Sequence, residues 1–108
     1  MKVLFIDNSV ERHKRHQSFI DKYQDQAIVI KLQEKMDLKD LESNEFDIYV
    51  VHRGNILEYK FIDNNQLGNE RIFFSGSETN PEKTKTGIYT DDNESLYKFL
   101  KDEISKYI

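Results

Sequence analysis

The sequence predicts an α/β fold in which helices flank an open, mostly parallel sheet. Four short apolar runs, rich in β-branched and aromatic residues, are bounded by polar residues. They are continuous rather than alternating, which is typical of strands buried on both faces of a sheet. The segments between the runs carry apolar residues at helical spacing. Strands and helices therefore alternate along the chain, which is the order of an open parallel sheet.

The predicted strands are short and spread along the chain. They cover residues 3–6, 27–30, 48–51 and 72–74, with a weaker fifth run at 87–90. Only residues 76–86 remain for the connection before the fifth run, whereas a parallel crossover usually needs about a dozen residues or more. We therefore expect either an extended loop as the crossover or a fifth strand that is an antiparallel edge.

The first helix is predicted to begin at Asn8 or Ser9, because a short polar side chain there can accept a hydrogen bond from an unpaired backbone N–H. Glu11 stands three residues after Asn8 and completes a capping box. The inward face of this helix is weakly marked, and it would use Val10, His13, Phe19, Ile20 and Tyr23.

The last predicted helix has the clearest apolar face. Asp91 or Asp92 can cap its start. Its apolar residues recur at three- and four-residue spacing and are Leu96, Tyr97, Leu100, Ile104 and Tyr107. We expect this face to pack on the sheet. Shorter helices are predicted around residues 36–43 and 56–65.

Length and composition predict one folded domain over residues 1–108 and exclude several kinds of site. The 16 Lys and Arg against 20 Asp and Glu give a net charge of -4, whereas proteins that bind duplex nucleic acid carry a basic excess. The absence of cysteine excludes disulfides, thiolate zinc sites and cysteine nucleophiles. The sequence also lacks the G-x-G-x-x-G, Walker, H-E-x-x-H and G-x-S-x-G motifs.

The first apolar run is too short to direct the chain to a membrane. It ends at Asp7 after residues 3–6, whereas a signal peptide needs about 7–15 apolar residues and a membrane span about 20. We therefore expect a cytoplasmic protein that has no membrane among its partners.

Polar residues follow the predicted strands at the point where each strand ends. In open α/β sheets, ligands bind beyond the carboxyl ends of the strands. The candidate site residues at these ends are Asp7, Asn8, His52, Ser75 and Asp91. We expect their side chains to meet at one edge of the sheet.

Four segments resemble the strands of response-regulator receiver domains. Residues 2–8 resemble the first strand, and residues 46–52 resemble the third, which in receivers ends in the phosphoacceptor aspartate. Residues 72–76 resemble the fourth strand and residues 87–91 the fifth. The resemblance implies a three-layer flavodoxin-like, receiver-like fold with a five-stranded, mostly parallel sheet of order 2-1-3-4-5. The helix between strands four and five would be missing or very short.

Only some of the site positions implied by the resemblance carry the residue type that receivers have there. Asp7 matches the first acidic position and Ser75 matches the hydroxyl position, but Asn8 replaces the second acidic residue. His52 stands where the phosphorylated aspartate should be, and Asp91 stands where a lysine is usual. Phosphoryl transfer to a carboxylate needs that carboxylate, a divalent metal and a cation. The resemblance therefore implies a pseudo-receiver whose aspartyl-phosphate switch does not work.

We expect a non-enzymatic signalling or regulatory module that acts through protein–protein interaction and needs no cofactor. The alternative is a small metal-dependent enzyme or metal-binding domain that uses Asp7, His52 and Asp91, with Asp7 and His52 as ligands of Mg²⁺ or another divalent metal. Each residue also has a plainer role. Asp7 can cap the following helix, and His52 can fill a strand end and bond to backbone.

The run at 12–16 is the most concentrated positive charge in the sequence. Arg12, Lys14 and Arg15 are candidates for docking an acidic protein partner, and the alternative is an ordinary solvated helix face. The sequence does not decide whether the chain forms a homodimer. Tyr49, Tyr59 or Tyr89 would mark the dimer surface if they were exposed.

Overall fold

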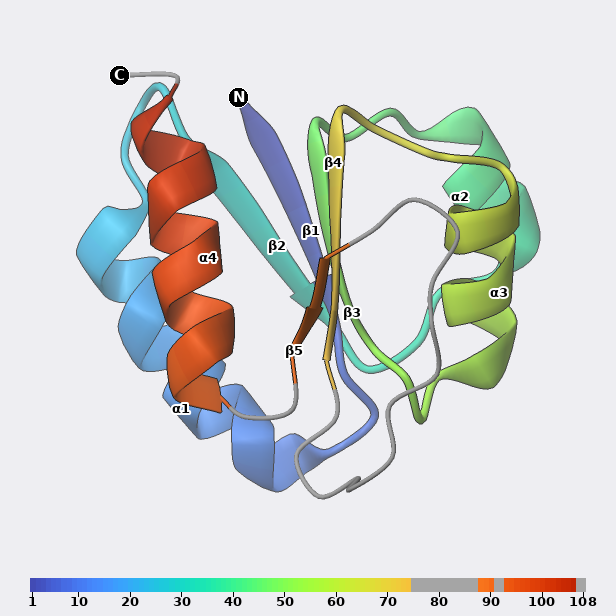
Figure 1. Cartoon of the computed structure of the whole chain (residues 1–108), viewed down its shortest axis with the longest axis horizontal. Helices are drawn as coiled ribbons and strands as arrows, with labels where there is room; N and C mark the ends of the chain where they lie inside the picture. The colour runs from blue at the N-terminus through green and yellow to red at the C-terminus, as the bar shows by residue number, and fades with distance from the viewer. Residues whose placement is uncertain (75–87, 91–92, 107–108) are drawn as a thin grey trace.

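The computed structural model describes residues 1–74, 88–90 and 93–106. Its elements are β1 (Lys2–Ile6), α1 (Val10–Tyr23), β2 (Val29–Gln33), α2 (Leu38–Ser43), β3 (Ile48–His52), α3 (Ile56–Asn64), β4 (Glu70–Phe74), β5 (Ile88–Thr90) and α4 (Asn93–Ser105). Helices α1 and α4 cover one face of the sheet, and α2 and α3 cover the other (Figure 1). The predicted α/β architecture, with helices flanking a parallel sheet, is confirmed.

Four five-residue strands form the body of the sheet, in the order β2-β1-β3-β4, and every neighbouring pair is parallel. The three-residue β5 lies parallel beside β4, with Thr90 opposite Phe74. Of the two arrangements expected for the fifth run, the antiparallel edge is therefore wrong. The four-strand order agrees with the prediction, but the fifth position holds only this short segment. The predicted loss of the helix between β4 and β5 concerns residues 75–87, which lie outside the described residues.

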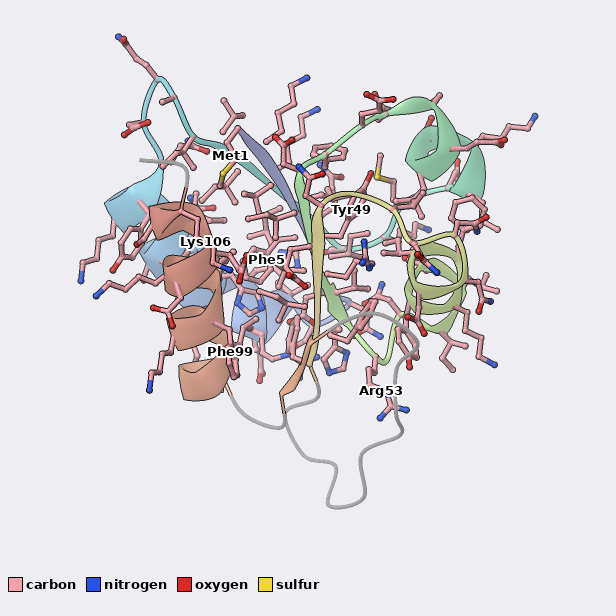
Figure 2. The ribbon with its side chains drawn as sticks, turned by 45° about the horizontal axis from the view of Figure 1, so that its top comes forward. Met1, Phe5, Tyr49, Arg53, Phe99 and Lys106 are labelled. Carbon is pink, nitrogen blue, oxygen red and sulfur yellow. The ribbon has the colours of Figure 1, made fainter. Side chains whose placement is uncertain are left out.

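The central strands are buried on both faces, as their continuous apolar sequences require. Val3 and Phe5 of β1 belong to the core under α1 and α4, while Leu4 and Ile6 belong to the core under α2 and α3. Figure 2 shows the same division, with Phe5 on the α4 side of the sheet and Tyr49 on the α3 side. Alternation along each strand thus supplies both helical layers with core residues.

Helix α1 begins where the sequence predicts, but its inward face differs. Ser9 is the N-cap, and its hydroxyl accepts from the Arg12 N–H at 3.4 Å. Val10, predicted to face inward, is 61% exposed because the first turn projects beyond the end of β1. The buried histidine is His16, which is 0% exposed, whereas the predicted His13 is only partly buried.

Helix α4 packs as its apolar spacing predicts. Leu96, Leu100 and Ile104 are buried against the sheet, and Tyr97 packs against the same core. The predicted caps Asp91 and Asp92 lie outside the described residues. Within the described part of the chain, no helix has the length and apolar content that a membrane crossing requires.

Candidate functional site

Asp7 lies at the carboxyl end of β1, in the middle of the sheet, and has no exposed surface. Its backbone N–H donates to the Gln33 carbonyl at the end of β2 at 3.0 Å. The Arg12 guanidinium holds its carboxylate at two points. Nε donates to Oδ2 and Nη2 donates to Oδ1, both at 2.8 Å. This is the paired geometry in which arginine binds carboxylates most strongly.

Three further contacts surround Asp7. His16 Nε2 lies 2.7 Å from Oδ2, and the Ser9 N–H donates to Oδ1 at 3.0 Å. His13 Nε2 lies 2.6 Å from the Asp7 carbonyl oxygen. Burial would raise the pKa of Asp7, but the hydrogen bonds from His16, Arg12 and Ser9 and the Arg12 charge outweigh it. The pKa of Asp7 is therefore held far below its ordinary value, and the carboxylate stays ionised.

His16 continues this arrangement to α4. Its Nδ1 lies 2.7 Å from the Tyr97 hydroxyl. Burial raises the pKa of Tyr97 to about 12, so the hydroxyl keeps its proton and can donate it to Nδ1. Because an ionised carboxylate can only accept, Nε2 of His16 must carry the hydrogen that faces Asp7. We call Arg12, Asp7, His16 and Tyr97 the Asp7 network.

Aromatic rings hold the His16 imidazole in place. Its centroid lies 4.6 Å from that of Phe5, 5.6 Å from that of Phe74 and 5.8 Å from that of Tyr97. The order carboxylate, imidazole, hydroxyl is the order of a nucleophilic triad. Here the imidazole has no exposed surface, and burial raises the pKa of the phenol, which disfavours the nucleophilic phenolate. The geometry of the Asp7 network therefore does not favour a nucleophilic role for the Tyr97 hydroxyl.

His52 lies at the carboxyl end of β3 and bonds to its own turn. Its Nδ1 accepts from the Gly54 N–H at 3.0 Å, and its ring meets Phe74 edge to face at 5.2 Å. A Cβ on Gly54 would lie only 2.7 Å from His52 Nδ1, so this close approach suits glycine. His52 thus has the backbone-bonded arrangement that was the plainer of the two roles expected for it.

A cleft opens beside these strand ends, between the residues that follow β1, β2 and β3. Asn55 lies at its floor and is 6% exposed. Its Oδ1 accepts from the Asn8 N–H at 2.9 Å, and its Nδ2 donates to the Glu34 carbonyl at 2.8 Å and to Glu58 Oε2 at 3.0 Å. The cavity measures about 390 Å³. Asn8, a predicted site residue, reaches it through this backbone contact.

The sequence patterns did not single out Asn55, Glu58, the inward position of His16 or the hydroxyl of Tyr97. The spacing of Asn55 and Glu58 is that of a capping box and could have drawn attention to this turn. Among His, Asp and Glu of the described residues, no group of three is placed to hold a metal ion. Asp7 is instead bound by Arg12 and His16, and the predicted Ser75 and Asp91 lie outside the described residues.

The basic run of α1 divides between two environments. Arg12 turns inward to Asp7 with 26% of its side chain exposed, whereas Lys14 and Arg15 are exposed. Tyr49 and Tyr59 are 2% and 5% exposed, so they cannot mark a dimer surface as suggested by the sequence. Tyr89 lies in β5, whose side chains are outside the described part.

Comparisons with models of protein families, with curated proteins and with solved structures find no match to this chain.

Proposed function

We propose that this chain is a pseudo-receiver, a non-enzymatic signalling or regulatory module that resembles a response-regulator receiver domain and acts through protein–protein interaction. The proposal includes the finer fold, a flavodoxin-like sheet of order 2-1-3-4-5. The parallel order β2-β1-β3-β4 with helices on both faces supports it. So does the position of Asp7 and Asn8 directly after β1, at the carboxyl edge where such sheets carry their sites.

The observation that carries the proposal is the saturation of the Asp7 carboxylate. Both oxygens are bound by Arg12, and each has one further donor, His16 on Oδ2 and the Ser9 N–H on Oδ1. A magnesium ion needs free oxygen ligands in nearly ideal octahedral geometry. It would have to displace a fixed guanidinium from a buried carboxylate. The residue that matches the acidic position of receivers is thus neutralised from within the chain.

The phosphoacceptor position points the same way. His52 offers a ring nitrogen where receivers offer a carboxylate, and its Nδ1 is engaged by the Gly54 N–H. The alternative metal-dependent function of Asp7, His52 and Asp91 stays a prediction, and the contacts of Asp7 and His52 do not favour it.

The proposed interaction is with a protein that carries acidic groups. Lys14 and Arg15 are exposed on α1, and Arg12 joins them with a quarter of its side chain in solvent. These side chains can attract an acidic segment, most strongly at low ionic strength.

The test is incubation of the whole chain with acetyl phosphate and Mg²⁺, followed by intact mass spectrometry. We expect no phosphoryl adduct under conditions that phosphorylate a receiver with its aspartate intact. His52→Gln is the matched variant. An adduct of wild type that disappears in this variant would overturn the proposal and identify His52 as an acceptor, and an adduct that persists would place the acceptor elsewhere and overturn it as well.

A further inference from the structure

We propose that the Asp7 network is a mechanical link between the strand ends and α4, so that removal of Arg12 from Asp7 loosens α4. This link deepens the proposed function. It rests on that function in one respect, because the acidic partner proposed there would draw Arg12 away from Asp7. It goes beyond that function by naming the path inside the molecule and the helix that responds.

The link is continuous and spans three elements. Asp7 follows β1, Arg12 and His16 stand on α1, and Tyr97 stands on α4. The joining distances are 2.8 Å from Arg12 to Asp7, 2.7 Å from Asp7 to His16 and 2.7 Å from His16 to Tyr97. Residues 81 positions apart in sequence, His16 and Tyr97, are thus joined by one hydrogen bond.

One oxygen of Asp7 contacts both Arg12 and His16. Oδ2 of Asp7 accepts from Arg12 Nε and from His16 Nε2. The position of this atom is therefore set jointly by the two side chains. If Arg12 leaves, a buried ionised carboxylate loses two charged donors, and it must turn or admit water to find others. Either response moves the oxygen that holds His16.

His16 has little freedom to absorb such a movement. It is completely buried, and Phe5 and Phe74 pack against its ring. Its second nitrogen is bonded to Tyr97, so a shift of the ring changes that bond. The Tyr97 ring in turn stacks on Phe19, with the ring centroids 5.3 Å apart and the planes 15° apart. A shift of the His16 ring therefore changes the contact between α1 and α4.

Arg12 is the charged member of the network that a partner can reach. A quarter of its side chain is exposed, whereas Asp7 and His16 have no exposed side-chain surface. A carboxylate of a docked protein offers the guanidinium the same two oxygens that Asp7 offers. Exposed Lys14 and Arg15 on the same helix would attract such a group. Loss of Arg12 by substitution imitates this capture without needing the partner.

The experiment is amide hydrogen exchange by NMR on the whole chain. The readout is the exchange rate of Leu100 on α4 relative to that of Val50 in β3, because a global loss of stability changes both. We expect Arg12→Gln to raise this ratio about tenfold or more, and the control Lys14→Gln, at an exposed position of the same helix, to change it less than about twofold. Tyr97→Phe keeps the ring stacking but removes the hydroxyl. In that background Arg12→Gln should add less than about twofold.

Two results would overturn the link. An unchanged ratio in Arg12→Gln would show that α4 does not respond to Arg12. An equal rise in the wild-type and Tyr97→Phe backgrounds would show that the effect does not pass through the His16–Tyr97 bond. If Arg12→Gln does not fold, Arg12→Lys keeps the charge with poorer geometry and should change the ratio in the same direction. Neither of the two overturning results contradicts the pseudo-receiver proposal, which only a phosphoryl adduct overturns.

Discussion

Arg12 and Asp7 are joined by two hydrogen bonds of 2.8 Å, although Asp7 is completely buried and Arg12 is 26% exposed. The pair closes the turn between β1 and α1, because the two residues are only five positions apart. A single arginine on the first turn of α1 thus supplies a positive charge that balances the buried carboxylate at this strand end. The same contact fixes the position of α1 on the sheet.

Removing the guanidinium should be costly. Arg12→Gln leaves the Asp7 carboxylate buried with His16 and one backbone N–H, and we expect the free energy of unfolding to fall by about 2–4 kcal/mol. Lys14→Gln removes an equal charge from an exposed position and should change it by less than about 0.5 kcal/mol. Urea denaturation monitored by circular dichroism measures both. Equal effects of the two substitutions would show that the pair contributes no more than surface charge.

The Asp7 carboxylate should also make stability depend on pH. Its pKa is lowered in the folded chain, so the unfolded chain binds the proton more readily. The stabilisation is therefore complete above the unfolded pKa, about 4, and is lost as pH falls from there towards the lowered folded value. We expect Asp7→Asn to flatten the fall in stability below pH of about 4, and Asp21→Asn, at an exposed position on α1, to leave it steep. Urea midpoints across the acid range test this, and equal slopes in both variants would contradict it.

The sequence predicts the fold of this molecule better than the side-chain contacts of its candidate site. The strands are recognisable because their residues must be buried on both faces, and Asp7 is recognisable because it ends the first of them. The partners of Asp7 are harder to find. Tyr97 fits the apolar stripe of α4, so the use of its hydroxyl depends on the long-range approach of α1, which no local pattern encodes. The choice of His16 over His13 depends on the angle at which α1 crosses the sheet.

His16 should hold one defined tautomer. Its Nε2 faces an ionised carboxylate and must donate, while Nδ1 can accept from the protonated Tyr97 hydroxyl. We expect long-range ¹H–¹⁵N spectra to show a hydrogen on Nε2 and none on Nδ1. Tyr97→Phe leaves Nδ1 buried without a donor and should cost about 1–3 kcal/mol. Observation of the Nδ1–H tautomer would contradict the hydrogen-bond direction derived for the network.

Two glycines should respond differently to alanine. At Gly68, φ is +74°, and a Cβ would meet the Asp47 carbonyl at 2.9 Å, so Gly68→Ala should cost about 1–3 kcal/mol. At Gly54 the close neighbour is the His52 ring, a side chain that can move. Gly54→Ala should cost less, and His52→Ala should remove that cost in the double variant. Thermal unfolding compares them, and a larger loss at Gly54 would show that the His52 ring is held rigidly.

The Gln24 side chain binds one backbone donor at the β2 edge of the sheet. Strand β2 lies at that edge, and its Val29 N–H donates inward to the Met1 carbonyl. The N–H of Ile30 therefore points outward, where Gln24 Oε1 accepts it at 2.9 Å. Gln24→Ala leaves this donor free to pair with a strand of another copy, which is the hazard of an unprotected edge. We expect faster concentration-dependent association in light scattering for Gln24→Ala than for Gln26→Ala, a nearby exposed control. Identical association rates would mean that one blocked donor does not protect the edge.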